Sequence, residues 1–321
     1  MAAVEPTPVR LAAPMARYLA ATRPGFLGMT AAGALLGLAC AHSSGIAIDA
    51  AKAVLTMLFA LIAHAGANVL NDYHDARNGS DAANAERCFP YTGGSRIIQN
   101  GVLTEAAMGR FAWLLLASVV PAGLWLTWHA GGALLGIGLA GLAIGWAYSA
   151  PPFALMSRGL GELAVGAGWL LVVVGADFVQ RGSFAALPLV TGFGFALHVA
   201  AVLLVNEFPD VAADARAGKR NLVVRLGPAR ARLLPPSLHL LAHAWLLGGV
   251  LRGVLPVPTL LALAAAVPAL RGARVLGRAA ARPSALEPAI VATIAAALAY
   301  GGLVALGLLL STYLPGAALP G

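Results

Sequence analysis

The sequence is poor in charge and in cysteine. Of its 321 residues, 11% are Asp, Glu, Lys or Arg, whereas 60% are hydrophobic. Soluble domains carry about 25% charged residues, so a soluble globular protein is excluded. Of the two cysteines, Cys40 lies in an apolar run and Cys88 in a polar loop, so no disulfide or cysteine–metal framework is expected.

Long apolar runs recur along the whole chain, and each is near or above the ~18–20 residues that cross a bilayer as a helix. The alternating pattern of membrane β-strands is absent, so helices are the expected spanning elements. Hydropathy predicts nine: Phe26–Ile48, Ala53–Leu70, Phe111–Thr127, Gly131–Tyr148, Gly161–Phe178, Phe184–Val205, Leu233–Val250, Val254–Leu270 and Pro288–Leu310. We therefore expect an all-α polytopic membrane protein, with a cytoplasmic segment at 1–24, one transmembrane domain at 25–314 and a C-terminal tail at 315–321.

The basic residues are divided unevenly between the predicted loops. Of the 21 Lys and Arg residues, all but Lys52, Arg181 and Arg252 fall in the N-terminal segment or in loops on its side of the membrane. Loops rich in Lys and Arg stay in the cytoplasm, so we expect the N-terminus inside, with the chain in the cell (inner) membrane. The net charge of +8 then reflects topology, and no nucleic-acid partner is expected.

Six of the thirteen acidic residues lie in two short clusters, which directly follow the second and sixth predicted spans. The first cluster contains Asp72, Asp75 and Asp81, and the second contains Glu207, Asp210 and Asp214. Carboxylates at the ends of membrane helices are costly, which favours a functional role. Both clusters lie on the predicted cytoplasmic side.

Helical spacing brings the polar groups of each cluster onto one face. Residues three or four apart are neighbours on a helix, so one stripe is expected to hold Asn68, Asn71, Asp72 and Asp75, and the other Asn206, Asp210 and Asp214. Carboxylate and amide oxygens suit Mg²⁺, which keeps several waters and bridges to substrate phosphates. We expect Asp72, Asp75, Asp210 and Asp214 to be catalytic, and these four with Asn71 and Asp81 to bind the metal.

Two other interpretations of the paired acids remain open. One is that the acids simply solvate a cytoplasmic loop, although two stripes at matching spacing on one membrane side argue against this. An ion-coupled transporter is the alternative from a different class of protein. Transporters place their polar groups near the bilayer midplane, in broken helices, whereas these acids lie at one membrane face beside basic residues.

Several basic and polar residues are candidates for binding the substrates. Lys219, Arg220, Arg96 and Arg158 are cations suited to phosphate oxygens. His64 and His198 lie one to two turns deeper than the acidic stripes, where each could bind an acceptor or pair with a neighbouring helix. His239 and His243 are spaced as a two-histidine metal site, without a third ligand nearby.

Three motifs resemble those of the UbiA superfamily of intramembrane aromatic prenyltransferases. They are Asn71-Asp72-x-x-Asp75, Asp210-x-x-x-Asp214-x-x-x-Gly218-Lys219-Arg220, and Tyr148-Ser149-Ala150-Pro151-Pro152 leading to Arg158-Gly159-Leu160-Gly161-Glu162. The resemblance implies a helical bundle around a central cavity, with a polyprenyl diphosphate held by Mg²⁺ between the two acidic motifs. It also suggests that Tyr148 and Ser149 reach the diphosphate, although Tyr148 would suit a membrane interface equally well.

Within the superfamily, the chain is most similar to the 1,4-dihydroxy-2-naphthoate polyprenyltransferases of menaquinone synthesis. This rests on Asn78–Asp81, Thr92–Ser95 and Ala217–Gly227. Arg96 and the segment Glu207–Pro209 depart from the pattern, so 4-hydroxybenzoate, homogentisate or a lipid alcohol stay as alternative acceptors. The resemblance implies that the polyprenyl tail enters from membrane lipid and that the cavity excludes water from an allylic cation.

Overall fold

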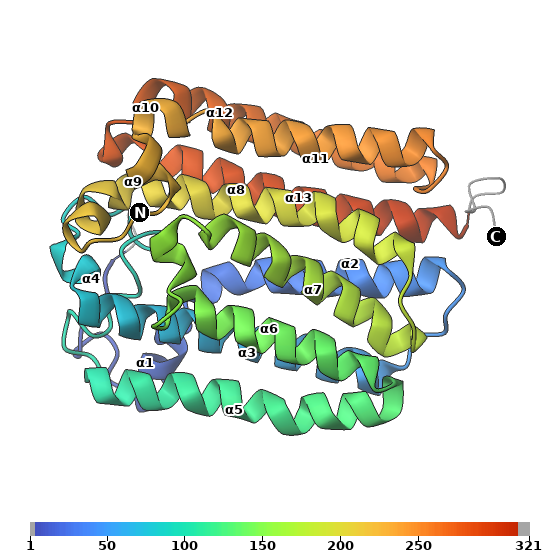
Figure 1. Ribbon diagram of the computed structural model, residues 1–321, viewed down its shortest axis with the longest axis horizontal. Coiled ribbons are helices and arrows are strands. Elements are labelled where there is room, and N and C mark those ends of the chain that lie inside the picture. The colour runs from blue at the N-terminus through green and yellow to red at the C-terminus, as the bar shows by residue number, and fades with distance from the viewer. Residues whose placement is uncertain (1–3, 314–321) are drawn as a thin grey trace.

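The computed structural model describes residues 4–313, and this part of the chain contains helices and no strand. Figure 1 shows the long helices lying side by side with their axes roughly aligned, as a bundle. The expectation of an all-α polytopic membrane protein is confirmed.

Eight helical segments are long and apolar enough to span a membrane. These are α2 (Pro24–Ser43), α3 (Ala50–Asn78), α5 (Glu105–Ala130), α7 (Gly161–Arg181), α8 (Ala186–Arg216), α10–α11 (Pro228–Leu251), η2–α12 (Val257–Ala279) and α13 (Glu287–Ser311). A further apolar helix, α6 (Ala133–Ser149), has 17 residues. Length and hydropathy thus support eight candidate spans, and the ninth stays a prediction.

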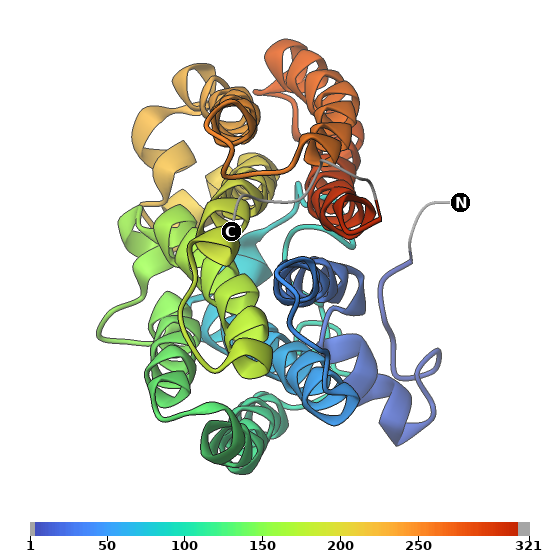
Figure 2. The ribbon, with the colours of Figure 1, turned by 90° about the vertical axis from the view of Figure 1, so that its right-hand side faces the viewer.

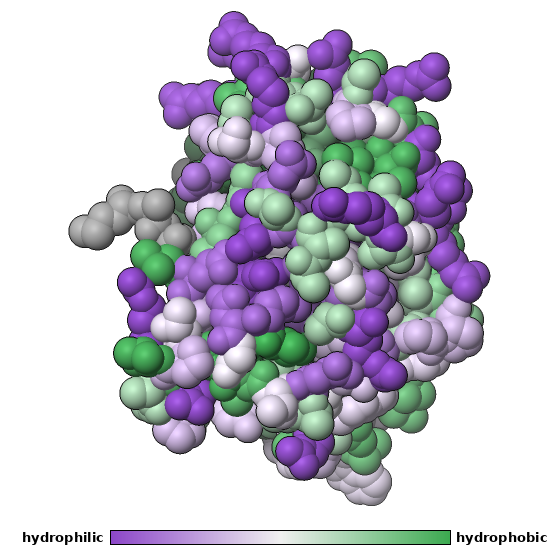
Figure 3. All heavy atoms as spheres, turned by 90° about the vertical axis from the view of Figure 1, so that its left-hand side faces the viewer, coloured by the Kyte–Doolittle hydropathy of each residue, from purple (hydrophilic) through white to green (hydrophobic). Residues whose placement is uncertain are grey.

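The short elements gather at one end of the bundle. They are α1 (Pro14–Ala21), α4 (Ser80–Ala83), η1 (Leu155–Arg158), α9 (Leu222–Leu226), α10 (Pro228–Ala231) and η3 (Pro283–Ala285). Figure 1 shows α1, α4, α9 and α10 at its left-hand side, and Figure 3 looks onto that end, where hydrophilic side chains are concentrated. We call it the polar end of the bundle.

The two longest helices carry the two acidic motifs to this polar end. Helix α3 has 29 residues and α8 has 31, so at 1.5 Å per residue both exceed about 40 Å, against a hydrocarbon core of about 30 Å. Asp49 caps the start of α3 by accepting a hydrogen bond from the Lys52 N–H, and Gly79, at φ 82°, ends it. The predicted spans stop short of the acids, but the helices continue through them.

Small residues let the central helices approach closely. At Gly37 of α2, a Cβ atom would clash with the Val173 carbonyl of α7, and at Gly33 it would lie 3.1 Å from the Phe195 ring of α8. Membrane helices commonly pack through such positions. Viewed along the bundle in Figure 2, α2 lies between α3 and α13. This packing fixes the helices that line the cavities described below.

One predicted span differs in form from the structure. The run Val254–Leu270 was expected to be one helix, but the chain forms 3₁₀ turns over η2 (Val257–Ala265) and then α12 (Ala266–Ala279). Thr259 in these turns packs against α13, where a Cβ on Gly307 would lie 2.6 Å from it. The tail predicted at 315–321 lies outside the described residues.

Reporter fusions test whether α6 crosses the membrane. If all nine helices span and the polar end is cytoplasmic, a reporter active only outside the cytoplasm should be active when inserted at Gly131 and silent at Phe153. A fusion after Tyr313 should be active. Activity at both Gly131 and Phe153, with silence after Tyr313, would instead show that α6 does not cross.

Candidate active site

The first acidic motif lies on the last turns of α3 and on α4. Asp72 is buried, and its Oδ2 accepts a hydrogen bond from the Ser95 N–H at 2.9 Å. The Asp75 carboxylate accepts hydrogen bonds from Asn71 and Asn78, each at 3.1 Å. Asp81 is also buried and follows the turn at Gly79. The expected stripe and the position of Asp81 beyond the end of the helix are both seen.

The second acidic motif lies on the last turns of α8. Asp210 accepts hydrogen bonds from the Asn84 side chain at 2.6 Å and from the Gly93 N–H at 3.2 Å. Asp214, one turn further on, accepts from Asn221 at 2.8 Å. Pro209 lies inside this helix and has no N–H to donate, so one backbone carbonyl of the preceding turn lacks its helical partner.

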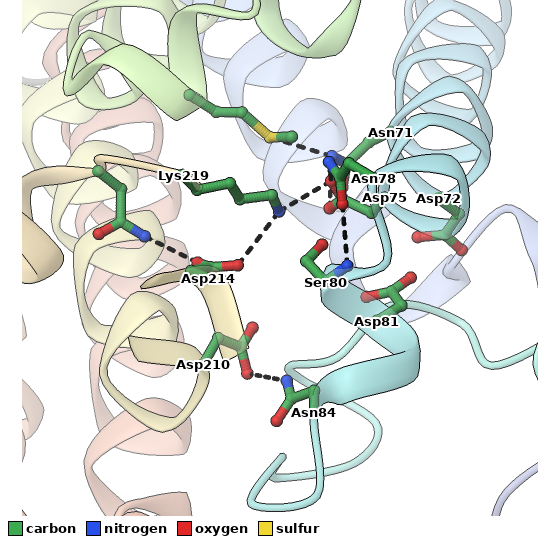
Figure 4. Close-up of polar contacts among 12 residues, drawn as sticks. Asn71, Asp72, Asp75, Asn78, Ser80, Asp81, Asn84, Asp210, Asp214 and Lys219 are labelled. Carbon is green, nitrogen blue, oxygen red and sulfur yellow. Dashed lines mark hydrogen bonds and ion pairs between the residues drawn. The ribbon is translucent and has the colours of Figure 1, made fainter. Parts of the chain in front are cut away.

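Lys219 joins the two motifs directly. Its Nζ lies 2.8 Å from Asp75 Oδ1 and 3.2 Å from Asp214 Oδ1. Figure 4 shows this ammonium group between the two carboxylates, with Asp72 and Asp81 on the α3 side and Asp210 on the α8 side. The side chain is buried, so the ion pairs are only weakly screened by water. The lysine therefore balances charge between acids that are far apart in sequence.

The loop between α4 and α5 backs both motifs. Its N–H groups at Gly93 and Ser95 bond to Asp210 and Asp72, one from each motif. Gly94 has φ 71°, and a Cβ there would lie 2.5 Å from Asp81 Oδ2 and 3.1 Å from Asp72 Oδ1. Only glycine fits this position, because the backbone must approach the carboxylates and adopt a left-handed conformation.

Burial and like charge shift the titration of the groups outside the spans. The pKa of Asp81 is raised well above its ordinary value, first by burial and then by the neighbouring charges of Asp75 and Asp72. Burial alone would lower the pKa of Lys219, but the carboxylates of Asp75 and Asp214 outweigh it and raise the pKa. Lys219 is therefore charged throughout the physiological range, and Asp81 ionises more readily when a further cation is near.

The carboxylate and amide oxygens of the site are suitable ligands for a hard divalent cation that is bound together with phosphate. Asp72 Oδ1 and Asn206 Oδ1 are buried without a hydrogen-bond donor anywhere in residues 4–313. No three His, Cys, Asp or Glu side chains of that range converge closely enough to hold an ion alone. Mg²⁺ usually takes only one or two carboxylates and completes its shell with waters and phosphate oxygens. Carboxylates divided between two facing motifs fit this mode of Mg²⁺ coordination.

Three adjoining cavities lead from the acids into the bundle. The acidic cavity, about 100 Å³, is lined by Lys219 together with Asp75, Asp81, Asp210 and Asp214, whereas Asp72 does not line it. It shares Asn71, Tyr148 and Asn206 with the membrane cavity, about 260 Å³, which also contains Asn68 and His64. That cavity shares Ala60 and Gly168 with the lateral cavity, about 230 Å³, whose lining is almost wholly apolar. Polar groups are thus concentrated at one end of a path that becomes apolar.

His64 and His198 do not occupy equivalent positions. His64 lines the membrane cavity, and its Nδ1 lies 2.8 Å from Thr30 Oγ1. His198 instead faces α11, where its Nδ1 lies 2.8 Å from His239 Nδ1 and its ring packs on Tyr300. Of the two roles left open for His198, the structure shows pairing with a neighbouring helix, so its assignment as an acceptor-binding residue is corrected; the side chain is fully buried between helices.

Several other expected ligands lie outside the cavities. Arg158 and Arg220 are exposed; Arg158 donates to the Pro152 carbonyl at 2.6 Å. Arg96 is buried, but it bonds to the Asp81 backbone carbonyl, behind the carboxylates. Ser149 is buried and lines none of the three cavities. Of the expected cations, only Lys219 faces the acids from inside the site.

Arg23 is the main site residue that the sequence analysis missed. It lines both the acidic and the membrane cavity, and its Nη1 lies 3.8 Å from Asp72 Oδ1. It precedes Pro24 at the start of α2 and has φ 55°, a left-handed conformation that is costly for a non-glycine residue. The sequence signal that could have identified it is the dipeptide Arg23-Pro24, a basic residue placed directly before the first span.

Glu207 is a second residue whose environment was not foreseen. It lines the acidic cavity, and one of its oxygens accepts a hydrogen bond from the Val223 N–H at 3.4 Å. Glu162, at the start of α7, is also buried, and its Oε1 has no hydrogen-bond donor in the described residues. The departure at Glu207 thus adds a buried carboxyl group to the lining of the acidic cavity.

Comparison with known proteins agrees with this geometry. The model of the UbiA prenyltransferase family matches residues 26–287. A 1,4-dihydroxy-2-naphthoate octaprenyltransferase of Mycobacterium tuberculosis is 33% identical over 227 residues, which cover 69% of this chain and 73% of that protein.

Two solved structures share the fold. A UbiA homolog from Aeropyrum pernix K1 has a TM-score of 0.60 at 18% identity, covering 90% of this chain and 98% of that one. A UbiA homolog from Archaeoglobus fulgidus bound to DMAPP and Mg²⁺ has a TM-score of 0.52 at 19% identity, covering 71% and 76%. Together with the family match, they place the two acidic motifs in a known helical architecture. The chain therefore belongs to the UbiA prenyltransferase family and is a prenyltransferase of the membrane.

Proposed function

We propose that the protein transfers a polyprenyl group from polyprenyl diphosphate to 1,4-dihydroxy-2-naphthoate in a Mg²⁺-dependent reaction, with its polar end in the cytoplasm. The observation that carries this proposal is the pair of acidic motifs, which face each other across Lys219 at the mouth of an apolar path. The acceptor rests on the matching relative, which is named for that substrate. The Mg²⁺ requirement is supported by the homolog described with DMAPP and Mg²⁺.

The acidic cavity would hold the diphosphate. Asp72, Asp75, Asp81, Asp210 and Asp214, with the amide of Asn71, would bind Mg²⁺, which would neutralise the diphosphate as it leaves. Lys219 would move its ion pairs from the carboxylates to the phosphate oxygens, because a bound metal would satisfy the carboxylates instead. Breaking the C1–O bond gives the electron pair to the diphosphate and leaves an allylic cation.

The membrane cavity would then hold the reacting carbon atoms. Its lining is mostly apolar, so water that would quench the cation is kept out. The polyprenyl tail would continue into the lateral cavity and towards the lipid. Tyr148 and Asn206, which line both polar and apolar cavities, would lie next to C1.

The acceptor ring would attack C1 from within the membrane cavity. Its carbon next to a hydroxyl is electron-rich, and a bond from that carbon to C1 is completed when the hydroxyl loses its proton. His64 would bind this hydroxyl, because Thr30 fixes its Nδ1 and the ring lines the cavity. If the attacked carbon carries the carboxylate, the adduct then loses CO₂ and the ring regains its aromatic electrons.

Replacing an acid of either motif should abolish turnover. Asp75→Asn and Asp210→Asn keep the shape of the side chain but remove its charge, so each should lower kcat by at least about a hundredfold. The measurement is prenyl transfer by purified, correctly inserted protein. Glu105→Gln, which alters an exposed acid paired with Arg77, should have little effect. Near-normal turnover in both site variants would refute the two-motif site.

Lys219 and Arg220 should differ sharply, although they are adjacent. Lys219→Ala removes the buried cation between the motifs, so the KM for polyprenyl diphosphate should rise by about tenfold or more. Arg220→Ala removes an exposed side chain and should change this KM less than about twofold. Lys219→Arg should recover part of the loss. Equal effects at the two positions would contradict the inward placement of Lys219.

The acceptor can be tested by the fate of its carboxyl group. With 1,4-dihydroxy-2-naphthoate labelled in the carboxylate, each prenyl transfer should release one CO₂, because we expect attack at the carbon that bears it. The product should then lack the carboxyl group. A prenylated product that keeps its carboxylate, as 4-hydroxybenzoate would give, would exclude the naphthoate assignment while leaving prenyl transfer intact.

A further inference from the structure

A fourth cavity lies beside the acids but outside the path to the lipid. It has a volume of about 710 Å³ and is enclosed by the N-terminal segment, the start of α2 and the loop Phe89–Ser95, with one residue of α13. We call it the N-terminal cavity. Its size is in the range of small-molecule sites. It shares Arg23 with both the acidic and the membrane cavity, so this arginine stands where all three meet.

The lining of the N-terminal cavity suits a planar aromatic anion. Two arginines, Arg10 and Arg23, line the cavity together with the aromatic rings of Phe26, Phe89 and Tyr91. Aromatic rings stack on a flat ligand, and a guanidinium group can bind a carboxylate with two parallel hydrogen bonds. The isoprenoid chain itself carries no charge to pair with the arginines and is not planar. An aromatic acid can both stack on the rings and pair with the guanidinium groups.

The arginines of this cavity have hydrogen-bonding capacity to spare. The Arg10 side chain is exposed and has no hydrogen-bond or ion-pair partner in the described part of the chain. Arg23 donates from Nη2 to the Tyr91 carbonyl at 3.1 Å, while its buried Nε has no acceptor within residues 4–313. Both guanidinium groups can therefore donate to a carboxylate, Arg10 from its unpartnered side chain and Arg23 from Nε, while Arg23 keeps its contacts with Tyr91 and Asp72.

The one acid in the lining is already neutralised. Glu5 accepts hydrogen bonds from Arg87 at 2.7 Å and from Asn100 at 3.1 Å. Its burial would raise its pKa, but these hydrogen bonds and the charges of Arg87 and Arg96 outweigh that and lower it. Glu5 thus fastens the N-terminal segment to the loop that backs the acids. The charge left facing the cavity is positive.

We propose that the N-terminal cavity binds the aromatic carboxylate acceptor as it arrives from the polar side, with Arg10 and then Arg23 holding its carboxylate. This rests on the proposed function and adds a separate route for the second substrate. The polyprenyl tail takes the apolar path through the membrane and lateral cavities, so the two substrates do not compete for one entrance. The acceptor would pass Arg23, which lies next to Asp72, on its way from the N-terminal cavity to the carbon atom that carries the diphosphate.

The test uses Arg10, which is exposed and lines neither the acidic nor the membrane cavity. In Arg10→Ala, the KM for 1,4-dihydroxy-2-naphthoate should rise about fivefold or more, with kcat and the KM for polyprenyl diphosphate unchanged. Arg10→Lys should recover part of the loss. Arg110→Ala, an exposed arginine near the start of α5, is the matched control and should change none of these values.

A binding measurement separates this proposal from the proposed function. Full-length protein in lipid nanodiscs is titrated with 1-hydroxy-2-naphthoate, or with 1-naphthol, which lacks the carboxylate, in the absence of prenyl diphosphate. Arg10→Ala should weaken binding of the naphthoate and leave 1-naphthol unaffected. That result would support the site even if the wild type transferred no prenyl group, an outcome that would refute the proposed function alone.

Three results would overturn the proposal. Unchanged naphthoate binding and KM in Arg10→Ala would show that the cavity does not receive the acceptor. Equal weakening of naphthoate and naphthol would show that Arg10 supports the fold and not the carboxylate. A rise confined to the KM for polyprenyl diphosphate would make this cavity the entrance for the isoprenoid chain.

Discussion

The structure depends on holding several carboxylates close together at the edge of a low-dielectric bundle. Charges of one sign in such a place repel strongly unless cations lie between them. Lys219 and Arg23 supply part of that balance, and hydrogen bonds from Asn84, Gly93 and Ser95 supply more. The great length of α3 and α8 and the glycine turn at Gly94 all serve to bring these carboxylates together. The remaining negative charge is what makes the site attractive to a divalent cation carrying a diphosphate.

The spatial separation of polar and apolar surfaces also explains how two unlike substrates can meet. The acidic cavity is lined by charged groups, while the lateral cavity is lined by aliphatic side chains. The membrane cavity, which adjoins both, combines the two kinds of surface through residues such as Asn206 and His64. An allylic cation formed there is shielded from water yet remains within reach of the polar groups that position its partner.

Much of this arrangement could be predicted from the sequence, because it depends on local periodicity. The i, i+3 and i, i+4 spacing placed Asp72 with Asp75 and Asp210 with Asp214, and the basic asymmetry put both pairs at one end. Helix geometry also explains why His64 lines a cavity and His198 does not. His64 lies seven residues from Asn71, a turn of only about 20° around the helix, whereas His198 lies eight from Asn206, a turn of about 80°. Arg10 and Arg23 escaped notice because their roles depend on contacts between distant segments, and the only local signal was the Arg23-Pro24 dipeptide before the first span.

The central claim is that the two acidic motifs act together on one diphosphate through Mg²⁺. Its most direct test is the binding of a geranylgeranyl diphosphate analogue with sulfur at the bridging position, which cannot ionise readily, measured with and without Mg²⁺. The wild type should bind the analogue far more tightly with Mg²⁺, and neutralising one acid in either motif, Asp72→Asn or Asp214→Asn, should remove most of that increase. A variant that keeps the full magnesium dependence with one motif neutralised would contradict the claim.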